Sequence, residues 1–303
     1  MAASTAKSLK DILKNAQLPA LPQSAIRLLE LSQNQDNGPA QFAQPIEADP
    51  GLTGQVLKFV NSSYFGFSRE INSVKLAITL VGIRTIKNFA LWSAVFSLMP
   101  NPKCGPFDLK SLWQDSLRRA LFARAFGKTL GLKEAEDLFA AALLQDMAIP
   151  LLAKELSQQY VALLAGRNGG TARLSDLEQA EFGWTHAEAA AQIARSWRLP
   201  EDFAKFIETH ASLDKLLAEQ TKDQGKLTVA LSALLPAASD SQWAEREAFV
   251  CAYDQLAKGT GITAAKLFEQ LDKEFAEFAP ILKLATPAKS LVQYLTEAAP
   301  ATV

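Results

Sequence analysis

Histidine is scarce in this sequence, and this scarcity limits the chemistry that the chain can perform. Only His186 and His210 occur among 303 residues, so any mechanism or metal centre that needs three imidazoles is excluded. The two cysteines, Cys104 and Cys251, form neither a disulfide framework nor a Cys-x-x-Cys metal or redox motif. We therefore expect two ordinary thiols in a reducing cytoplasm.

Short motifs of the common enzyme classes are missing from the sequence. It contains no Walker A loop, no His-Glu-x-x-His, no Gly-x-Ser-x-Gly and no Gly-x-Gly-x-x-Gly after a strand. The residue counts permit a Ser-His-Asp triad, but no local signature supports one. The sequence thus indicates neither a known phosphate loop nor an activated nucleophile.

The charge composition argues against a protein that coats nucleic acid. Lys and Arg number 31 against 32 Asp and Glu, a net charge of -1, so the chain has no overall basic field and we expect no DNA partner. One basic cluster, Arg118, Arg119 and Arg124, is interpreted as a solvated helix face rather than a phosphate site. The hydrophobic fraction of 49% is sufficient for a buried core.

The elements that must position these residues are helices. Apolar residues recur at helical spacing, as in Leu52 and Val56 after Pro50, and few runs alternate with period two. Two capping boxes, Ser175–Glu178 and Thr185–Glu188, predict further helix starts. The chain is therefore predicted to be all-α.

Three parts are expected along the chain. Residues 18–103 form an N-terminal helical lobe, residues 104–212 a helical core, and residues 213–303 a C-terminal helical extension. The first ten residues carry charge without an apolar run behind them, so they are not expected to form a signal peptide. The longest apolar stretch, Phe89–Met99, is shorter than the roughly 20 residues that span a bilayer. We expect a cytoplasmic protein with no membrane partner.

Several blocks between residues 18 and 212 resemble, in order, those of the HDOD family, the HD-related output domains. Leu18–Pro22 reads Leu-Pro-x-Leu-Pro, Asp49–Leu52 reads Asp-Pro-x-Leu, and an Asn-Ser pair follows at Asn61. Further matching blocks are Tyr64–Gly66 and Ile71–Gly82. The resemblance implies an HD-like multi-helix core over residues 104–212 and a relation to the HD-GYP phosphodiesterases.

The resemblance also implies where the HD metal ligands fall. The first ligand histidine falls near Asp115 and the His-Asp doublet at Gln145 and Asp146, so two imidazoles are lost. The two later histidines match His186 and His210. Asp146, His186 and His210 should then lie close together, whereas a bridged two-metal centre is not expected because the amide of Gln145 is a poor ligand.

Three interpretations of this remnant site are open. It can be a buried polar cluster that holds no ion, a weak site for one divalent metal, or a set of unrelated exposed residues. The first is favoured, so we expect no catalytic residue and no firmly bound cofactor.

Three functions follow from the resemblance. The leading hypothesis is a non-catalytic regulatory or scaffolding module in bacterial signal transduction, whose partner is a signalling protein of unknown identity. The alternatives are a residual metal-dependent phosphohydrolase and a sensor that binds a nucleotide in the old pocket without cleaving it. Metal content separates the phosphohydrolase from the other two, and ligand-induced stabilisation identifies the sensor.

Overall fold

The described part of the chain is built from helices. A computed structural model describes residues 8–16, 18–34 and 36–297, and no strand occurs among them, so the all-α prediction is confirmed. Within these ranges no helix combines the length and apolar character required to cross a bilayer. The expectation for the N-terminus concerns residues 1–7 in part, and these lie outside the described residues. The helices are α1 (Leu9–Asn15), α2 (Gln23–Leu31), α3 (Pro39–Glu47), α4 (Pro50–Val60), α5 (Val74–Val81), α6 (Ile83–Leu98), α7 (Leu109–Thr129), α8 (Ala135–Leu144), α9 (Ile149–Glu155), α10 (Ser157–Gly166), α11 (Leu174–Phe182), α12 (His186–Ser196), α13 (Glu201–Thr209), α14 (Leu213–Ala218), α15 (Gln224–Ser232), α16 (Arg246–Leu256), α17 (Ala264–Phe278), the 3-10 helix η1 (Ala279–Leu282) and α18 (Leu291–Thr296).

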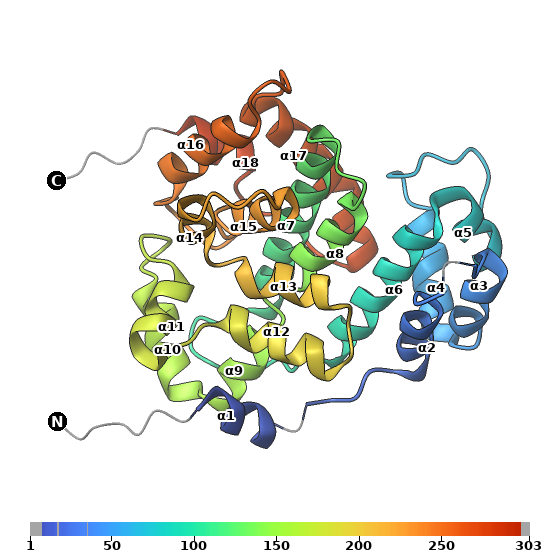
Figure 1. The fold of residues 1–303 in the computed structure, drawn as a ribbon, viewed down its shortest axis with the longest axis horizontal. Coiled ribbons are helices and arrows are strands. Elements are labelled where there is room, and N and C mark those ends of the chain that lie inside the picture. The colour runs from blue at the N-terminus through green and yellow to red at the C-terminus, as the bar shows by residue number, and fades with distance from the viewer. Residues whose placement is uncertain (1–7, 17, 35, 298–303) are drawn as a thin grey trace.

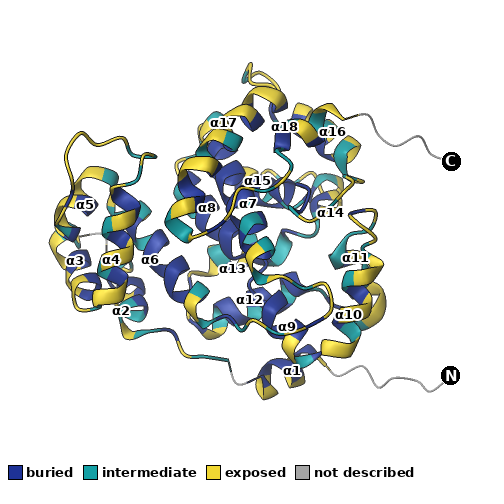
Figure 2. Ribbon diagram, turned by 180° about the vertical axis from the view of Figure 1, so that it is seen from behind, coloured by how far each residue is buried: buried dark blue, intermediate teal, exposed yellow. Residues whose placement is uncertain are grey.

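The helices form a small lobe beside a larger core (Figure 1). Helices α2 to α5 gather at one side, and α6 leads from this lobe to the core, where it packs on α8. Helices α7 and α8 pack along each other, and α12 and α13 form a second pair. Helix α1 lies apart from the lobe, next to α12. Buried residues concentrate on the inner helices of the core, and exposed residues follow the outer faces (Figure 2).

Helix α7 is the central element of the core. It begins where the Asp108 carboxylate accepts a hydrogen bond from the Ser111 amide at 2.8 Å, and it ends before Gly131, whose φ of +73° suits glycine. Helices α8, α15 and α17 all pack against it. Large side chains such as Phe122 and Phe126 are consequently fully buried along its length.

The three arginines of α7 do not lie on a solvated face, so that prediction is wrong. Arg118 and Arg124 are each only 3% exposed, and Arg119 is also largely buried. Because helices cover α7 on several sides, a charged side chain on it loses water and requires a partner. Arg118 donates to the carbonyl oxygen of Lys289, and Arg124 pairs with Glu274 at 3.1 Å.

The two predicted capping boxes have different outcomes. At the start of α12, the Thr185 amide donates to the Glu188 carboxylate at 2.7 Å, so this box is confirmed. The box at Ser175 is wrong, because α11 begins at Leu174, so that Ser175 lies inside the helix, and its start has no side-chain cap. Glu178, which would have completed that box, is fully buried and is directed instead at His186.

The α15–α16 loop, residues 233–245, closes against the turn between α10 and α11. The amides of Ser241 and Gln242 both donate to the Gly169 carbonyl at 3.0 Å. Gly170 has a φ of +99°, and a Cβ atom placed there would lie 2.5 Å from the Gln242 carbonyl oxygen. The absence of a side chain at Gly170 therefore allows the two backbones to approach.

Replacing Gly170 by alanine should destabilise the fold by about 2–4 kcal/mol, since the new methyl group meets backbone and the backbone is left-handed. Gly183 is the matched control. It has a similar φ of +75°, but no atom lies within 4 Å of the position that a Cβ would take, so Gly183→Ala isolates the conformational cost of about 1 kcal/mol. Urea unfolding measures both variants, and equal losses would show that the close approach contributes nothing.

Candidate functional site

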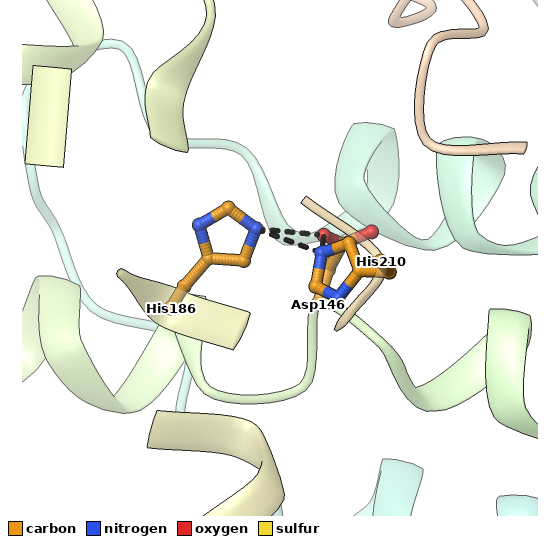
Figure 3. Close-up of side chains that lie close together, drawn as sticks. All are labelled: Asp146, His186 and His210. Carbon is orange, nitrogen blue, oxygen red and sulfur yellow. Dashed lines mark hydrogen bonds and ion pairs between the residues drawn. The ribbon is translucent and has the colours of Figure 1, made fainter. Parts of the chain in front are cut away.

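Three side chains that are distant in the sequence converge in the core (Figure 3). Asp146 lies in the turn after α8, His186 is the first residue of α12, and His210 follows directly after α13. The Nε2 atoms of His186 and His210 lie 3.3 and 3.6 Å from Asp146 Oδ1 and 3.2 Å from each other. All three residues are buried. The pairing of α12 with α13 brings the two imidazoles together beside the end of α8.

The Nδ1 atom of each histidine, which faces away from Asp146, has its own hydrogen-bond acceptor. His186 Nδ1 lies 2.6 Å from Glu178 Oε2, which also accepts from the His186 amide at 2.8 Å. The Tyr160 hydroxyl donates to the other oxygen of Glu178 at 2.5 Å. His210 Nδ1 lies 2.6 Å from the Ile207 carbonyl oxygen. Both rings are therefore oriented so that Nε2 faces Asp146.

Charge inside the cluster is balanced by Arg119. This arginine, on α7, forms an ion pair with Asp146 Oδ2. Burial would raise the pKa of Asp146, but Arg119 and the two histidines hold it well below its usual value. Burial opposes the charge on His186, yet Glu178 and Asp146 raise its pKa to about 9, whereas burial lowers the pKa of His210. At neutral pH the metal-free cluster thus holds an ionised Asp146, a protonated His186 and a neutral His210.

The donor set of this cluster fits one divalent metal ion. Asp146, His186 and His210 each offer one ligand atom, and these atoms all lie within 4.8 Å of one another. A tetrahedral ion with ligands at about 2.1 Å requires ligand atoms about 3.4 Å apart, close to the separations here. Hydrogen bonds from Nδ1 to a carboxylate or a carbonyl are typical of metal-binding histidines. A bound ion would lower the pKa of a coordinated water, and it would have to displace the proton of His186.

The other two positions implied by the resemblance do not join these three donors. Asp115 lines the same cavity, of about 290 Å³, but its Oδ1 accepts a hydrogen bond from the Ala238 amide at 2.6 Å. Gln145 is fully buried and accepts from the Ser232 hydroxyl at 3.4 Å. Gln145 does not line the cavity, because it neighbours Asp146 in a tight turn and its side chain lies toward α15.

Sequence reasoning missed three residues of this site. From the sequence, Arg119 is predicted to lie on a solvated helix face and Glu178 to complete a helix cap, and Tyr160 has no predicted role. The signal that could have found Arg119 is its spacing from Asp115. The two residues are one helical turn apart, so they lie on the same face of α7. No pattern in the sequence pointed to the contact between Tyr160 and Glu178.

Asp115 should make the fold less stable as the pH rises from 4 to 7. Burial, opposed in part by Arg119, raises the pKa of this carboxyl to about 6. A carboxyl with a raised folded-state pKa contributes stability below its unfolded value near 4, and this contribution is lost through about pH 6. The expected loss is roughly 3 kcal/mol between pH 4 and pH 7. It is measured as the change, over this pH range, in the difference in unfolding free energy between wild type and Asp115→Asn. Parallel pH profiles of the two proteins would contradict it.

Comparison with known proteins identifies the family. The HDOD domain model matches residues 18–213. The chain belongs to the HDOD family. Among curated proteins, the chain is similar to an uncharacterised protein of Treponema pallidum (strain Nichols), 24% identical over 70% of this chain, and to the uncharacterised protein YuxH of Bacillus subtilis (strain 168), 36% identical over 31% of it. The aligned regions span only 40% and 22% of those two proteins.

Solved structures share the fold of this HDOD protein. An HDOD domain protein of unknown function from Geobacter sulfurreducens superposes with a TM-score of 0.73 at 19% identity, covering 91% of this chain and 97% of its own. A proposed phosphohydrolase from Shewanella amazonensis SB2B gives 0.68 at 22% identity, with 89% and 97% covered. A proposed signal transduction protein from Marinobacter aquaeolei VT8 gives 0.68 at 19% identity, with 93% and 66% covered. At these identities the likeness concerns the fold alone.

Proposed function

We propose that this HDOD protein is a non-catalytic regulatory module of bacterial signal transduction, which acts through contacts with a signalling protein. The observation that carries the proposal is the ion pair between Arg119 and Asp146 Oδ2. A two-metal hydrolytic centre needs both oxygens of a shared carboxylate for its ions. Here a guanidinium of the chain itself pairs with the second oxygen.

The neighbouring positions support the same proposal. Asp115 Oδ1 accepts a hydrogen bond from the Ala238 amide, and the buried Gln145 does not line the cavity, so neither side chain joins the three donors of the cluster. The α15–α16 loop also lines the cavity and is anchored there by an ion pair between Arg167 and Asp240 at 2.6 Å. The cluster is thus integrated into the packing of the core, which suits a stable surface for partners better than substrate turnover.

An activity assay tests the catalytic half of the proposal. The protein is supplied with Mn²⁺, Zn²⁺ or Fe²⁺ and offered cyclic dinucleotides and bis(p-nitrophenyl) phosphate. We expect no turnover above that of a folded His186→Ala, His210→Ala variant. Metal-dependent turnover above this control would overturn the proposal.

A labelling experiment tests the interaction half. Proximity labelling in the source cells should recover the same signalling protein with the wild type and with the double histidine variant, because the cluster is buried away from the surface. Failure to enrich any signalling protein over a free-label control would count against a role in protein contacts.

A second candidate function is a phosphohydrolase that uses a single metal ion. The specific observation in its favour is the spacing of 3.2–3.6 Å among the three donor atoms, with both Nδ1 atoms held by acceptors. The assay above separates the two candidates, since this one predicts turnover that requires metal and is lost in the histidine variant.

A further inference from the structure

A second cavity, of about 520 Å³, lies between the N-terminal lobe and the core. Residues of α2 and α6 line it on one side, and residues of α8, α13 and the start of α15 line it on the other. Its size and its place between two bodies are typical of small-molecule sites. Most of its wall is apolar, with side chains that include Leu29, Leu91, Val95, Leu144, Phe203 and Phe206.

The charged groups at this cavity are mostly neutralised by each other. Lys205 lies 3.6 Å from Asp202, and Lys226 lies 3.6 Å from Asp223. These two lysines therefore have carboxylate partners, and a ligand would have to compete for them.

Lys87 on α6 differs from the other two lysines. It lines the cavity and is half-buried, yet no carboxylate or hydrogen-bond acceptor among the described residues pairs with its amine. The nearby Asp137 is held by Arg84 at 3.4 Å and by the Asn88 amide at 3.2 Å. Burial lowers the pKa of Lys87, and the charge of Asp137 opposes this shift only in part. An anion in the cavity would supply the missing partner.

We propose that this inter-lobe cavity binds an amphipathic anion, a carboxylate with an apolar chain, whose charged group pairs with Lys87. The apolar chain would lie against the leucine and phenylalanine side chains of both bodies. The site is separate from the Asp146 cluster and independent of the function proposed for it. Because its walls come from the lobe and the core, occupancy would strengthen the contact between the two.

Calorimetry with decanoate and the uncharged decanol tests the proposal, since the two probes share the same apolar chain. Wild type should bind decanoate at least about tenfold more tightly than decanol, the value of one hydrogen bond to a charged group. Lys87→Met should abolish this preference and leave decanol binding unchanged. Lys205→Met, a lysine at the same cavity with its own carboxylate, should keep the preference.

A further variant checks the sign of the ligand charge. Glu134 also lines the cavity and has no ion-pair partner among the residues described. Glu134→Gln should leave decanoate binding unchanged or tighten it, because a negative charge is removed. Weaker binding in this variant, an undiminished preference in Lys87→Met, or no binding of decanoate to wild type would each overturn the proposal.

Discussion

Replacing Arg119 by methionine should lower the free energy of unfolding by about 3–5 kcal/mol, because it leaves the buried carboxylates of Asp146 and Glu178 with His186 as their only cation. Methionine retains much of the apolar volume of the arginine stem, so the loss reports charge rather than packing. Urea unfolding of the metal-free protein at pH 7 measures the effect. In the Arg119→Met, Asp146→Asn double variant, part of the loss should be recovered, since the Asp146 charge that paired with Arg119 is removed as well.

Arg195 is the matched control for this experiment. It pairs with Glu201 at 2.9 Å and with Glu208 at 2.7 Å, but its side chain is 35% exposed. Arg195→Met should therefore cost at most about 1 kcal/mol. If Arg119→Met costs no more than this surface variant, the ion pair with Asp146 does not stabilise the cluster.

Replacing Glu178 by alanine should lower the free energy of unfolding by about 3–5 kcal/mol. The carboxylate accepts hydrogen bonds from the His186 amide, from His186 Nδ1 and from the Tyr160 hydroxyl, and all three donors would lose their partner in a buried site. Glu178→Gln keeps one carbonyl acceptor and should cost less. Glu188→Ala, which removes only the capping carboxylate of α12, should cost about 1 kcal/mol.

Nuclear magnetic resonance gives this prediction a second readout. Glu178 and Asp146 together raise the pKa of His186 to about 9 against the effect of burial. In a folded Glu178→Gln variant the pKa of His186 should fall, while Tyr160→Phe should keep it raised because the carboxylate remains. An unchanged titration of His186 in Glu178→Gln would show that Glu178 does not set its charge.

Much of the fold follows from local signals in the sequence. Apolar spacing, the prolines that open α3 and α4 and the glycine after α7 each act within one or two turns, so they can be read without knowledge of the tertiary structure. The family blocks of residues 18–212 added the expected pairing of His186 and His210 with Asp146. The partners of these residues could not be predicted in the same way. Arg119 and Glu178 look like surface residues of amphipathic helices, and only the covering of α7 and α11 by other helices makes them buried.

Helix α7 lies within the segment that matches the family, and it packs against helices of the chain that follows this segment. Its Phe122 ring lies 5.5 Å from Phe249 and 6.5 Å from Phe268, both beyond residue 213, and Arg118 is held by the backbone at Lys289. Neither the matched segment nor the chain after residue 213 can unfold without exposing apolar surface of the other. The boundary of the family match is therefore no boundary in folding: both parts should unfold in one cooperative transition, and a chain cut after residue 213 should lose the packing of its central helix.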